Sequence, residues 1–219
     1  MKFTTIIFDM DGTIVETGHL WAQVNKTIIE RRGVTFTPDI EKYLAIHLNG
    51  LALPLSCAIV KDIIKTDEPI ELLMKEKAEV AAELYAKGLE LIHGFESFHA
   101  KVIQSKLKTG LATNADDSTF AVSKRLLNLE RFFGIHLYNI SHVNFLGKPH
   151  PAIYLYAAEK LESDPSHCIA IEDSTHGITA AKNAGMFCIG INTGKDKEKL
   201  NKADLIIDHY DDIKLEDIL

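Results

Sequence analysis

The chain has 219 residues, of which 46% are hydrophobic and 25% are charged. This composition excludes a disordered tail, and the length allows one or two globular domains. Lysine and arginine together number 24 against 31 aspartates and glutamates, so the formal net charge is −7. Because an acidic protein gains little from neutralising a phosphate backbone, we expect no nucleic-acid partner.

The cysteine pattern and the apolar segments indicate where the protein works. Cys57, Cys168 and Cys188 are odd in number and show no CxxC spacing, which is typical of a reducing compartment. The apolar start of the chain ends at Asp9 and lacks the features of a secretory signal. No segment reaches the roughly 20 apolar residues that span a membrane. We therefore expect a cytoplasmic protein without membrane association, and no motif indicates an obligate protein partner.

The first predicted element is a buried strand from Thr4 to Phe8, and four helical patterns follow it directly. These patterns cover Leu20 to Arg31, Ile40 to Leu48, Leu55 to Lys65 and Ile70 to Lys87. Four consecutive helices cannot all be crossovers on a sheet, so we expect a separate helical cap at residues 16–87. The catalytic core would then comprise residues 1–15 and 88–219.

Strands and helices alternate after the predicted cap. Apolar runs predict strands at Thr109 to Ala112, Cys168 to Ile171, Phe187 to Ile191 and Asp204 to Ile207. Helical patterns cover Ala152 to Leu161 and Gly177 to Ala184. This alternation predicts an α/β fold with a Rossmann-like, doubly wound, mainly parallel sheet and right-handed crossovers.

Two carboxylates follow the first strand, in the segment Asp9-Met10-Asp11-Gly12-Thr13. Residues two apart in an extended segment point the same way, so Asp9 and Asp11 can face one pocket. Ligands of open α/β sheets bind at this edge. A calcium loop is the alternative, but the chain after Gly12 lacks the further oxygen ligands that such a loop needs. A plain acidic turn is the other alternative.

A second acidic pair, Glu172 and Asp173, follows the predicted strand that ends at Ile171. Taken alone, this pair is typical of a surface loop. At the same sheet edge as Asp9 and Asp11, however, each close pair of carboxylates repels by about 4 kcal/mol at about 4 Å. Such a cluster needs a cation or protonation. Because all the donors are oxygens, Mg²⁺ is the expected ion.

Two further segments carry groups that suit a phosphate. Thr113 and Asn114 follow a predicted strand and can donate hydrogen bonds, although this pair is also typical of a helix start. Lys148 precedes the helical pattern from Ala152, near the positive end of the helix dipole, where a lysine that meets an anion is well placed. An exposed loop lysine is the alternative.

The four segments in this order resemble the haloacid dehalogenase-like hydrolases, in particular their helical-cap phosphatases and phosphomutases. The resemblance runs the length of the chain. It implies that Asp9 is the nucleophile that forms an aspartyl-phosphate and that Asp11 is the general acid and base. It also implies that Thr113 and Lys148 stabilise the transferring phosphoryl group and that Asn114 contacts the substrate.

For the metal, the resemblance implies that Mg²⁺ is held by Asp9, the Asp11 backbone carbonyl and Asp173. Glu172 would be either a ligand or a neighbour that supports one. Substrate contacts from the cap are expected at Trp21, His47 and Asn49, although a core role for Trp21 is the commoner alternative.

Several relatives of this family catalyse other reactions. Dehalogenases and phosphonate-cleaving enzymes do not need the second aspartate, so Asp11 argues against both. A β-phosphoglucomutase is the main alternative, yet the histidine and cap arginine of such enzymes are replaced here by Trp21 and Leu53. Signalling receiver domains carry similar groups in another order, and a non-catalytic binding protein would be expected to lose an acid. We therefore expect a Mg²⁺-dependent phosphatase acting on a small phosphorylated metabolite, such as a sugar phosphate or phosphoglycolate.

Overall fold

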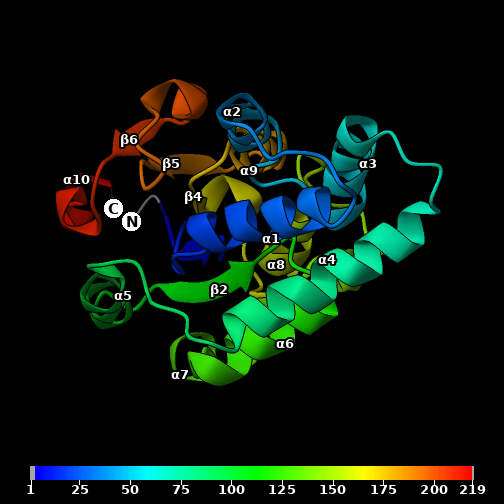
Figure 1. Ribbon diagram of the computed structural model, residues 1–219. Coiled ribbons are helices and arrows are strands. Elements are labelled where there is room, and N and C mark those ends of the chain that lie inside the picture. Colours follow the sequence, from blue (N-terminus) through cyan, green and yellow to red (C-terminus); the bar gives the residue numbers. More distant parts are fainter. Residues whose placement is uncertain (1–2, 219) are drawn as a thin grey trace.

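The computed structural model describes residues 3–218, and six parallel strands form one sheet at the centre of the molecule (Figure 1). The strands are β1 (Thr5–Phe8), β2 (Lys108–Ala112), β3 (Leu137–Tyr138), β4 (Cys168–Glu172), β5 (Phe187–Ile191) and β6 (Leu205–Ile207). Their order across the sheet is β3-β2-β1-β4-β5-β6. The predicted fold class is confirmed. The sequence pattern missed β3 because two residues are too few to show a period.

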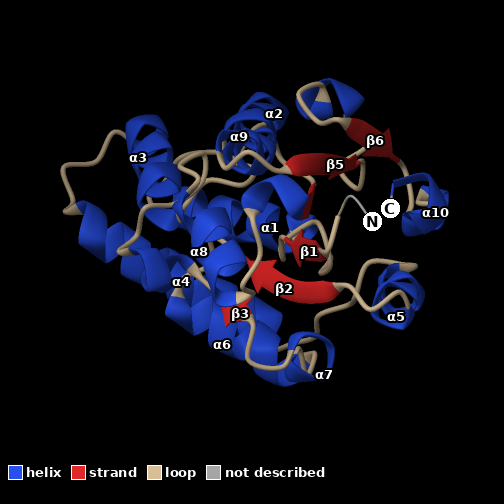
Figure 2. Cartoon of the chain, turned by 180° about the vertical axis from the view of Figure 1, so that it is seen from behind, coloured by secondary structure: helices blue, strands red, loops and turns tan. Residues whose placement is uncertain are grey.

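Each face of the sheet is covered by helices because successive residues of a strand point to opposite faces. In β1, Ile6 and Phe8 join one apolar cluster and Ile7 joins the other. Helices on both sides of the strands are visible in Figure 2. The core helices are α5 (Phe95–Gln104), α6 (Asp117–Leu126), α7 (Glu130–Phe133), α8 (Ala152–Lys160), α9 (Thr175–Asn183) and α10 (Leu215–Ile218).

Four helices lie between β1 and β2 and are called the helical insert below. They are α1 (Gly18–Glu30), α2 (Pro38–His47), α3 (Leu53–Ile64) and α4 (Ile70–Tyr85). The insert has its own apolar cluster, which includes Ile28, Val60 and Val80. Helix α3 begins before Pro54, earlier than predicted, because a proline is tolerated in the first helical turn.

The insert packs on the core at several points. Helix α4 lies beside α6 of the core (Figure 1). The two segments that connect the insert to the core are also paired, since Glu16 N donates to Glu90 O and Ile92 N donates to Ile14 O, each at 2.9 Å. The chain therefore leaves and re-enters the core at neighbouring points. The first two residues and the last residue of the predicted core, residues 1–2 and 219, lie outside the described part of the chain.

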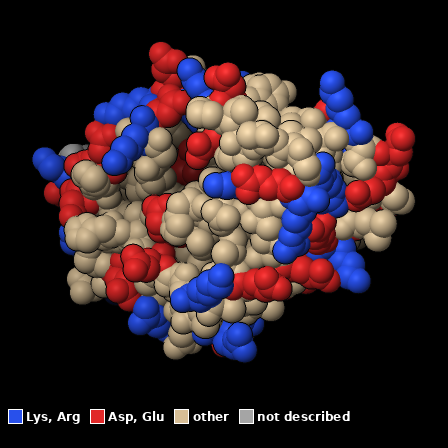
Figure 3. Space-filling model, viewed as in Figure 1, with Lys and Arg blue, Asp and Glu red and all other residues tan. Residues whose placement is uncertain are grey.

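Acidic and basic side chains are mixed over the face shown in Figure 3, without a broad field of either sign. Within residues 3–218, the structure contains no helix that combines the length and apolar character needed to cross a membrane.

Candidate active site

The candidate site lies where three strands end side by side. Phe8 of β1 pairs with Leu111 of β2 on one side and with Ile171 of β4 on the other. The polar segments that follow these strands therefore meet at one edge of the sheet. The strand order reverses at β1, and this is the point at which open α/β sheets bind ligands.

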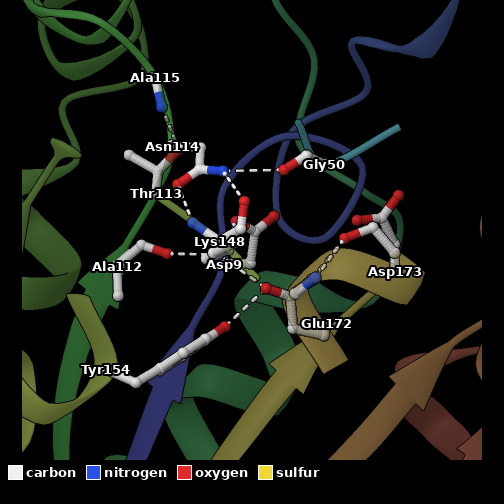
Figure 4. A network of polar contacts seen from close by, with 12 residues as sticks. Asp9, Gly50, Ala112, Thr113, Asn114, Ala115, Lys148, Tyr154, Glu172 and Asp173 are labelled. Atoms are coloured by element: carbon white, nitrogen blue, oxygen red, sulfur yellow. Dashed lines mark hydrogen bonds and ion pairs between the residues drawn. The ribbon is translucent and has the colours of Figure 1, made fainter. Parts of the chain in front are cut away.

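A buried ionic cluster forms at this edge around Lys148 (Figure 4). The Lys148 Nζ lies 2.5 Å from Asp9 Oδ1 and 2.6 Å from Glu172 Oε1, and it also donates to the Ala112 carbonyl at 2.9 Å. Lys148 is 1% exposed and Asp9 is 7% exposed, while Glu172 is fully buried. The lysine is thus a buried group that binds the predicted nucleophile, and not a free loop side chain.

Glu172 is held by hydrogen bonds on both of its oxygens. In addition to Lys148, the Tyr154 hydroxyl donates to Oε1 at 2.7 Å, and Ser174 Oγ donates to Oε2 at 3.2 Å. Charge-assisted bonds of this kind are among the strongest hydrogen bonds in proteins. The main contact of Glu172 is with Lys148, which favours a role in holding the lysine over a role as a principal metal ligand.

The acidic residues of the cluster fit a divalent cation. Asp9, Glu172 and Asp173 each offer an oxygen, and these oxygens lie within 4.8 Å of one another. With all groups ionised, the three carboxylates and the Lys148 ammonium leave a net formal charge of −2. Hard oxygen donors and a matching charge are the conditions under which Mg²⁺ binds.

The pKa values of the cluster show the repulsion that a cation would relieve. Burial raises the pKa of Asp9 well above its usual range despite the nearby Lys148, and Glu172 and Asp173 raise it further. Burial also raises the pKa of Asp173 to about 7, with a contribution from Glu172. Burial alone would lower the pKa of Lys148, but the carboxylates of Asp9 and Glu172 raise it, so the lysine stays charged.

The second aspartate of the first motif has a different environment. Asp11 lines the same cavity as Asp9, but its Oδ1 accepts a hydrogen bond from the Tyr85 hydroxyl of α4 at 2.7 Å. Burial raises the pKa of Asp11, and the hydrogen bond from Tyr85, followed by the nearby Thr17 and Trp21, opposes the rise. The two aspartates therefore differ in partners, a cation for Asp9 and neutral donors for Asp11.

Gly12 gives the turn after Asp11 its shape. Its φ of +82° is a conformation that side chains other than glycine rarely adopt, and a Cβ at this position would lie 2.3 Å from Asp173 Oδ2. The turn thus brings the backbone of the first motif directly against the acidic pair that follows β4.

Thr113 and Asn114 are used in different ways. Thr113 lines the cavity, and its Oγ1 accepts from Ala115 N at 3.1 Å, which leaves the hydroxyl hydrogen to donate to a ligand. The Asn114 amide is already occupied, because Oδ1 accepts from Lys148 N at 2.9 Å and Nδ2 donates to Gly50 O at 2.8 Å. Asn114 therefore fixes the Lys148 backbone and the insert, a role that the sequence did not predict.

A cavity of about 380 Å³ lies between the insert and the edge of the sheet. Trp21 and Asn49, two of the predicted substrate contacts, line it. His47 does not. The His47 ring is exposed, stacks on Tyr43 at 4.1 Å, and contacts the Tyr43 carbonyl through Nδ1. It lies on the outer face of α2, whereas Leu44 lies on the buried face.

The loop after α2 connects the insert to the site. Asn49 Nδ2 donates to Asp173 Oδ2 at 3.2 Å, and Gly50 O accepts from Asn114. Gly50 has a φ of +74°, and a Cβ there would lie 2.2 Å from Ser174 Oγ, so only glycine fits at this contact. The insert therefore contacts the acidic cluster through Asn49, and Gly50 packs against residues beside that cluster.

Some residues near the cavity were not expected from the sequence. Lys77 of α4 is fully buried, and its Nζ lies 2.5 Å from Oγ of Ser56, a residue that lines the cavity. Burial lowers the pKa of Lys77 to about 8. Lys77 lies four residues after Leu73 and three before Val80, which places it on the apolar face of α4. This spacing could have predicted its burial from the sequence. Tyr85 and Tyr154 had no signal beyond their hydrophobicity.

Comparison with known proteins agrees with this geometry. The haloacid dehalogenase-like hydrolase family matches residues 3–185, and the chain belongs to that family. A phosphorylated carbohydrates phosphatase from Thermotoga maritima is 28% identical over 183 residues, which cover 83% of this chain and 81% of that protein. A beta-phosphoglucomutase from Bacillus subtilis is 28% identical over 219 residues, covering 96% and 92%.

A solved structure gives the same result for the fold. A hydrolase of this family, of type IA, variant 3, from Entamoeba histolytica superposes with a TM-score of 0.86 at 27% identity. The match covers 99% of this chain and 97% of that one. The predicted family is therefore confirmed, and with it the prediction of an enzyme of the phosphoric monoester hydrolase class.

Proposed function

We propose that the chain is a Mg²⁺-dependent phosphatase that hydrolyses a small phosphorylated metabolite through an aspartyl-phosphate intermediate. The observation that carries this proposal is the contact of Asp9 with the buried Lys148 at the edge of a cavity that Thr113 and Asp173 also line. A carboxylate held by a cation, next to further acids that fit a metal, is suited to phosphoryl transfer, which depends on positioning and electrostatics.

Asp9 would act as the nucleophile. Lys148 binds its Oδ1, which fixes the carboxylate and leaves Oδ2 to attack phosphorus. As the new O–P bond forms, the ester O–P bond breaks and Asp11 gives its proton to the leaving oxygen. Asp11 then takes a proton from water, whose oxygen attacks the aspartyl-phosphate and releases inorganic phosphate.

The other residues would stabilise charge during these steps. Thr113 donates its hydroxyl hydrogen to a phosphoryl oxygen, and Lys148 provides a fixed positive charge beside Asp9. Mg²⁺, held by Asp9, Asp173 and the Asp11 backbone carbonyl, would offset the repulsion between the nucleophile and the phosphate. Glu172 holds Lys148 in place.

The helical insert would act as the cap of this enzyme, with residues 16–87 as the cap and the remainder as the catalytic core. Asn49 and Gly50 contact the site directly, so the cap excludes water from the cavity while they are docked. Trp21 and Asn49 would contact the leaving group, for which a sugar phosphate or a phosphoglycolate-like compound is the proposed class.

The cavity wall favours hydrolysis over the phosphomutase alternative. A phosphomutase must hold two phosphate groups at once, one of them on the side of the cap. The insert residues on the cavity wall are mostly apolar or neutral, and within the described chain they include the acidic Glu16 and Glu41 but no lysine or arginine. Lys199 of the core lies at the wall, where it donates to the Ala45 carbonyl.

The test is phosphate release from a panel of phosphorylated metabolites, with and without Mg²⁺. The panel includes β-glucose 1-phosphate, with an assay for glucose 6-phosphate. We expect Mg²⁺-dependent release from at least one singly phosphorylated compound. Isomerisation without net release would establish the mutase instead, and no reaction with any compound would refute the proposal in favour of a binding protein.

A further inference from the structure

Tyr85 is the last residue of α4, and its hydroxyl enters the site from the cap. The ring is fully buried and packs edge-on against Trp21, with the centroids 6.2 Å apart. The hydroxyl donates to Asp11 Oδ1 at 2.7 Å. This is a direct contact between the cap and a side chain of the first motif, and nothing in the nucleophile mechanism above uses it.

Tyr85 belongs to a set of neutral donors around the Asp11 carboxyl group. Thr17 and Trp21 also lie near Asp11, and, like Tyr85, they lower its pKa. Thr17 and Trp21 stand at the start of the insert and Tyr85 stands at its end, next to the paired connecting segments. Residues from both ends of the insert therefore surround the Asp11 carboxyl group, whereas Asp9 is bound by Lys148 of the core.

Neutral donors suit a group that must both give and take a proton. A neutral hydroxyl donor fixes the direction of a carboxyl group without placing a charge beside it, as the Tyr85 hydroxyl does for Asp11. Proton transfer requires the acid to lie within hydrogen-bond reach of the leaving oxygen. A small rotation of a catalytic group can lose much of its effect.

We propose that Tyr85 is a positioning residue for the proton transfer from Asp11 to the leaving oxygen. Its hydroxyl holds the carboxyl group in one orientation when the cap is docked, so that the ester oxygen receives the Asp11 proton as the O–P bond breaks. This inference rests on the proposed function, in which Asp11 is the general acid. Thr17 and Trp21 support the same orientation from the other end of the insert.

The experiment compares two esters of similar shape, phenyl phosphate and 4-nitrophenyl phosphate. Phenolate is the more basic leaving group and needs the proton, whereas 4-nitrophenolate leaves without it. The quantity measured is kcat/KM, because it reports the steps up to phosphoryl transfer and not the later hydrolysis. Tyr85→Phe removes only the hydroxyl and keeps the ring that packs on Trp21.

We expect Tyr85→Phe to lower kcat/KM about tenfold for phenyl phosphate and less than about twofold for 4-nitrophenyl phosphate. The tenfold loss is smaller than the full effect of a general acid, because Asp11 itself is still present. Tyr138→Phe is the matched control, since it removes a mostly buried hydroxyl that contacts His136 instead. That control should change neither value by more than about twofold. An equal loss for both esters with Tyr85→Phe, or no loss for phenyl phosphate, would overturn the proposal.

A second variant covers the case in which Tyr85→Phe does not fold. Thr17→Val keeps the shape of the side chain but removes a hydroxyl that acts on Asp11 from the other end of the insert. It should show the same selective loss for phenyl phosphate, and an equal loss for both esters would count against the proposal. If the wild-type chain hydrolyses neither ester nor any compound of the metabolite panel, the proposed function itself fails.

Discussion

Lys148 and Glu172 form a salt bridge in which neither side chain is more than 1% exposed, with Nζ and Oε1 2.6 Å apart. A buried pair of this kind contributes little by itself, yet removing one partner leaves an uncompensated charge. Here the bridge also sets the position of the lysine that binds Asp9. The same contact is therefore expected to matter for both stability and catalysis.

Glu172→Gln tests that double role. We expect the free energy of unfolding to fall by about 3 kcal/mol, because Lys148 loses one of its two carboxylates inside the protein. Phosphate release should fall by at least about tenfold, since the lysine no longer holds Asp9 firmly. Denaturant unfolding and steady-state assays measure the two effects.

Glu159→Gln is the control for this experiment. Glu159 pairs with Lys160, but its side chain is 72% exposed. A pair of this kind should contribute less than about 1 kcal/mol. Equal effects of the two substitutions would contradict the importance given to the buried bridge.

Asp9→Asn is expected to abolish turnover while leaving the protein folded. The amide keeps the shape of the side chain but cannot act as a nucleophile toward phosphorus. Circular dichroism checks the fold, and a phosphate assay in the presence of Mg²⁺ checks the activity. Mg²⁺-dependent phosphate release at the wild-type rate would remove Asp9 from its proposed role.

The pKa of Asp173 predicts a pH-dependent response to Mg²⁺. Burial and Glu172 raise this pKa to about 7, so the folded state binds the proton more tightly than the unfolded state does. Without metal, Asp173 therefore favours folding below pH 7, and this contribution is lost as the pH rises through about 7. A metal ion must displace the same proton.

The increase in melting temperature caused by Mg²⁺ should consequently be larger at pH 8 than at pH 6. Differential scanning fluorimetry at the two pH values, with matched ionic strength, measures it. The Asp173→Asn variant, which lacks the titrating group, should show a reduced response at both. The same increase at both pH values in the wild-type chain would contradict the assignment of Asp173.

Lys77 predicts an unusual gain in stability. Burial lowers its pKa to about 8, so folding at pH 7 requires the burial of an ammonium group whose partner is Ser56. With about 1.4 kcal/mol for each pKa unit, the cost is on the order of 3 kcal/mol. Lys77→Met should therefore raise the free energy of unfolding at pH 7 by about 1–2 kcal/mol.

The sign of the effect follows from the lowered pKa. Because the unfolded chain binds the proton more tightly, the wild-type protein gains stability as the pH rises above about 8, and the advantage of Lys77→Met shrinks toward pH 10. Lys75→Met, at a position that is 74% exposed on the same helix, is the control and should show no such trend. Destabilisation by Lys77→Met at pH 7 would refute this reasoning.

How much of this site could be predicted depends on the kind of interaction. Local patterns predict the acids at the strand ends, Asp9 and Asp173, and the turn at Gly12. The structure brings these residues together at one edge of the sheet. The partners of these residues do not follow from such patterns. Tyr85 and Asp11 are 74 positions apart, and the packing of α4 against α1 and α6 brings them together.

The predicted contacts from the insert show the same limit. Trp21 and His47 were both predicted to contact the substrate, and of these two only Trp21 lines the cavity. The outcome depends on the rotation of each helix about its axis, which tertiary packing sets. Asn114 lines the cavity, as a substrate contact would, but the bonds of its amide to Gly50 and Lys148 could not be predicted from local patterns. Side-chain partners from distant segments decide such roles.

The central claim is that Asp9 carries the phosphoryl group during turnover, and Asp11→Asn gives the most direct test. Without the general base, the phosphoenzyme should form and then hydrolyse slowly. The variant is mixed with Mg²⁺ and 4-nitrophenyl phosphate, quenched in acid and analysed by peptide mass spectrometry. We expect one phosphoryl group on the peptide that contains Asp9, absent from the Asp9→Asn, Asp11→Asn double variant. Unimpaired turnover of Asp11→Asn with no phosphoryl group on this peptide would contradict the account.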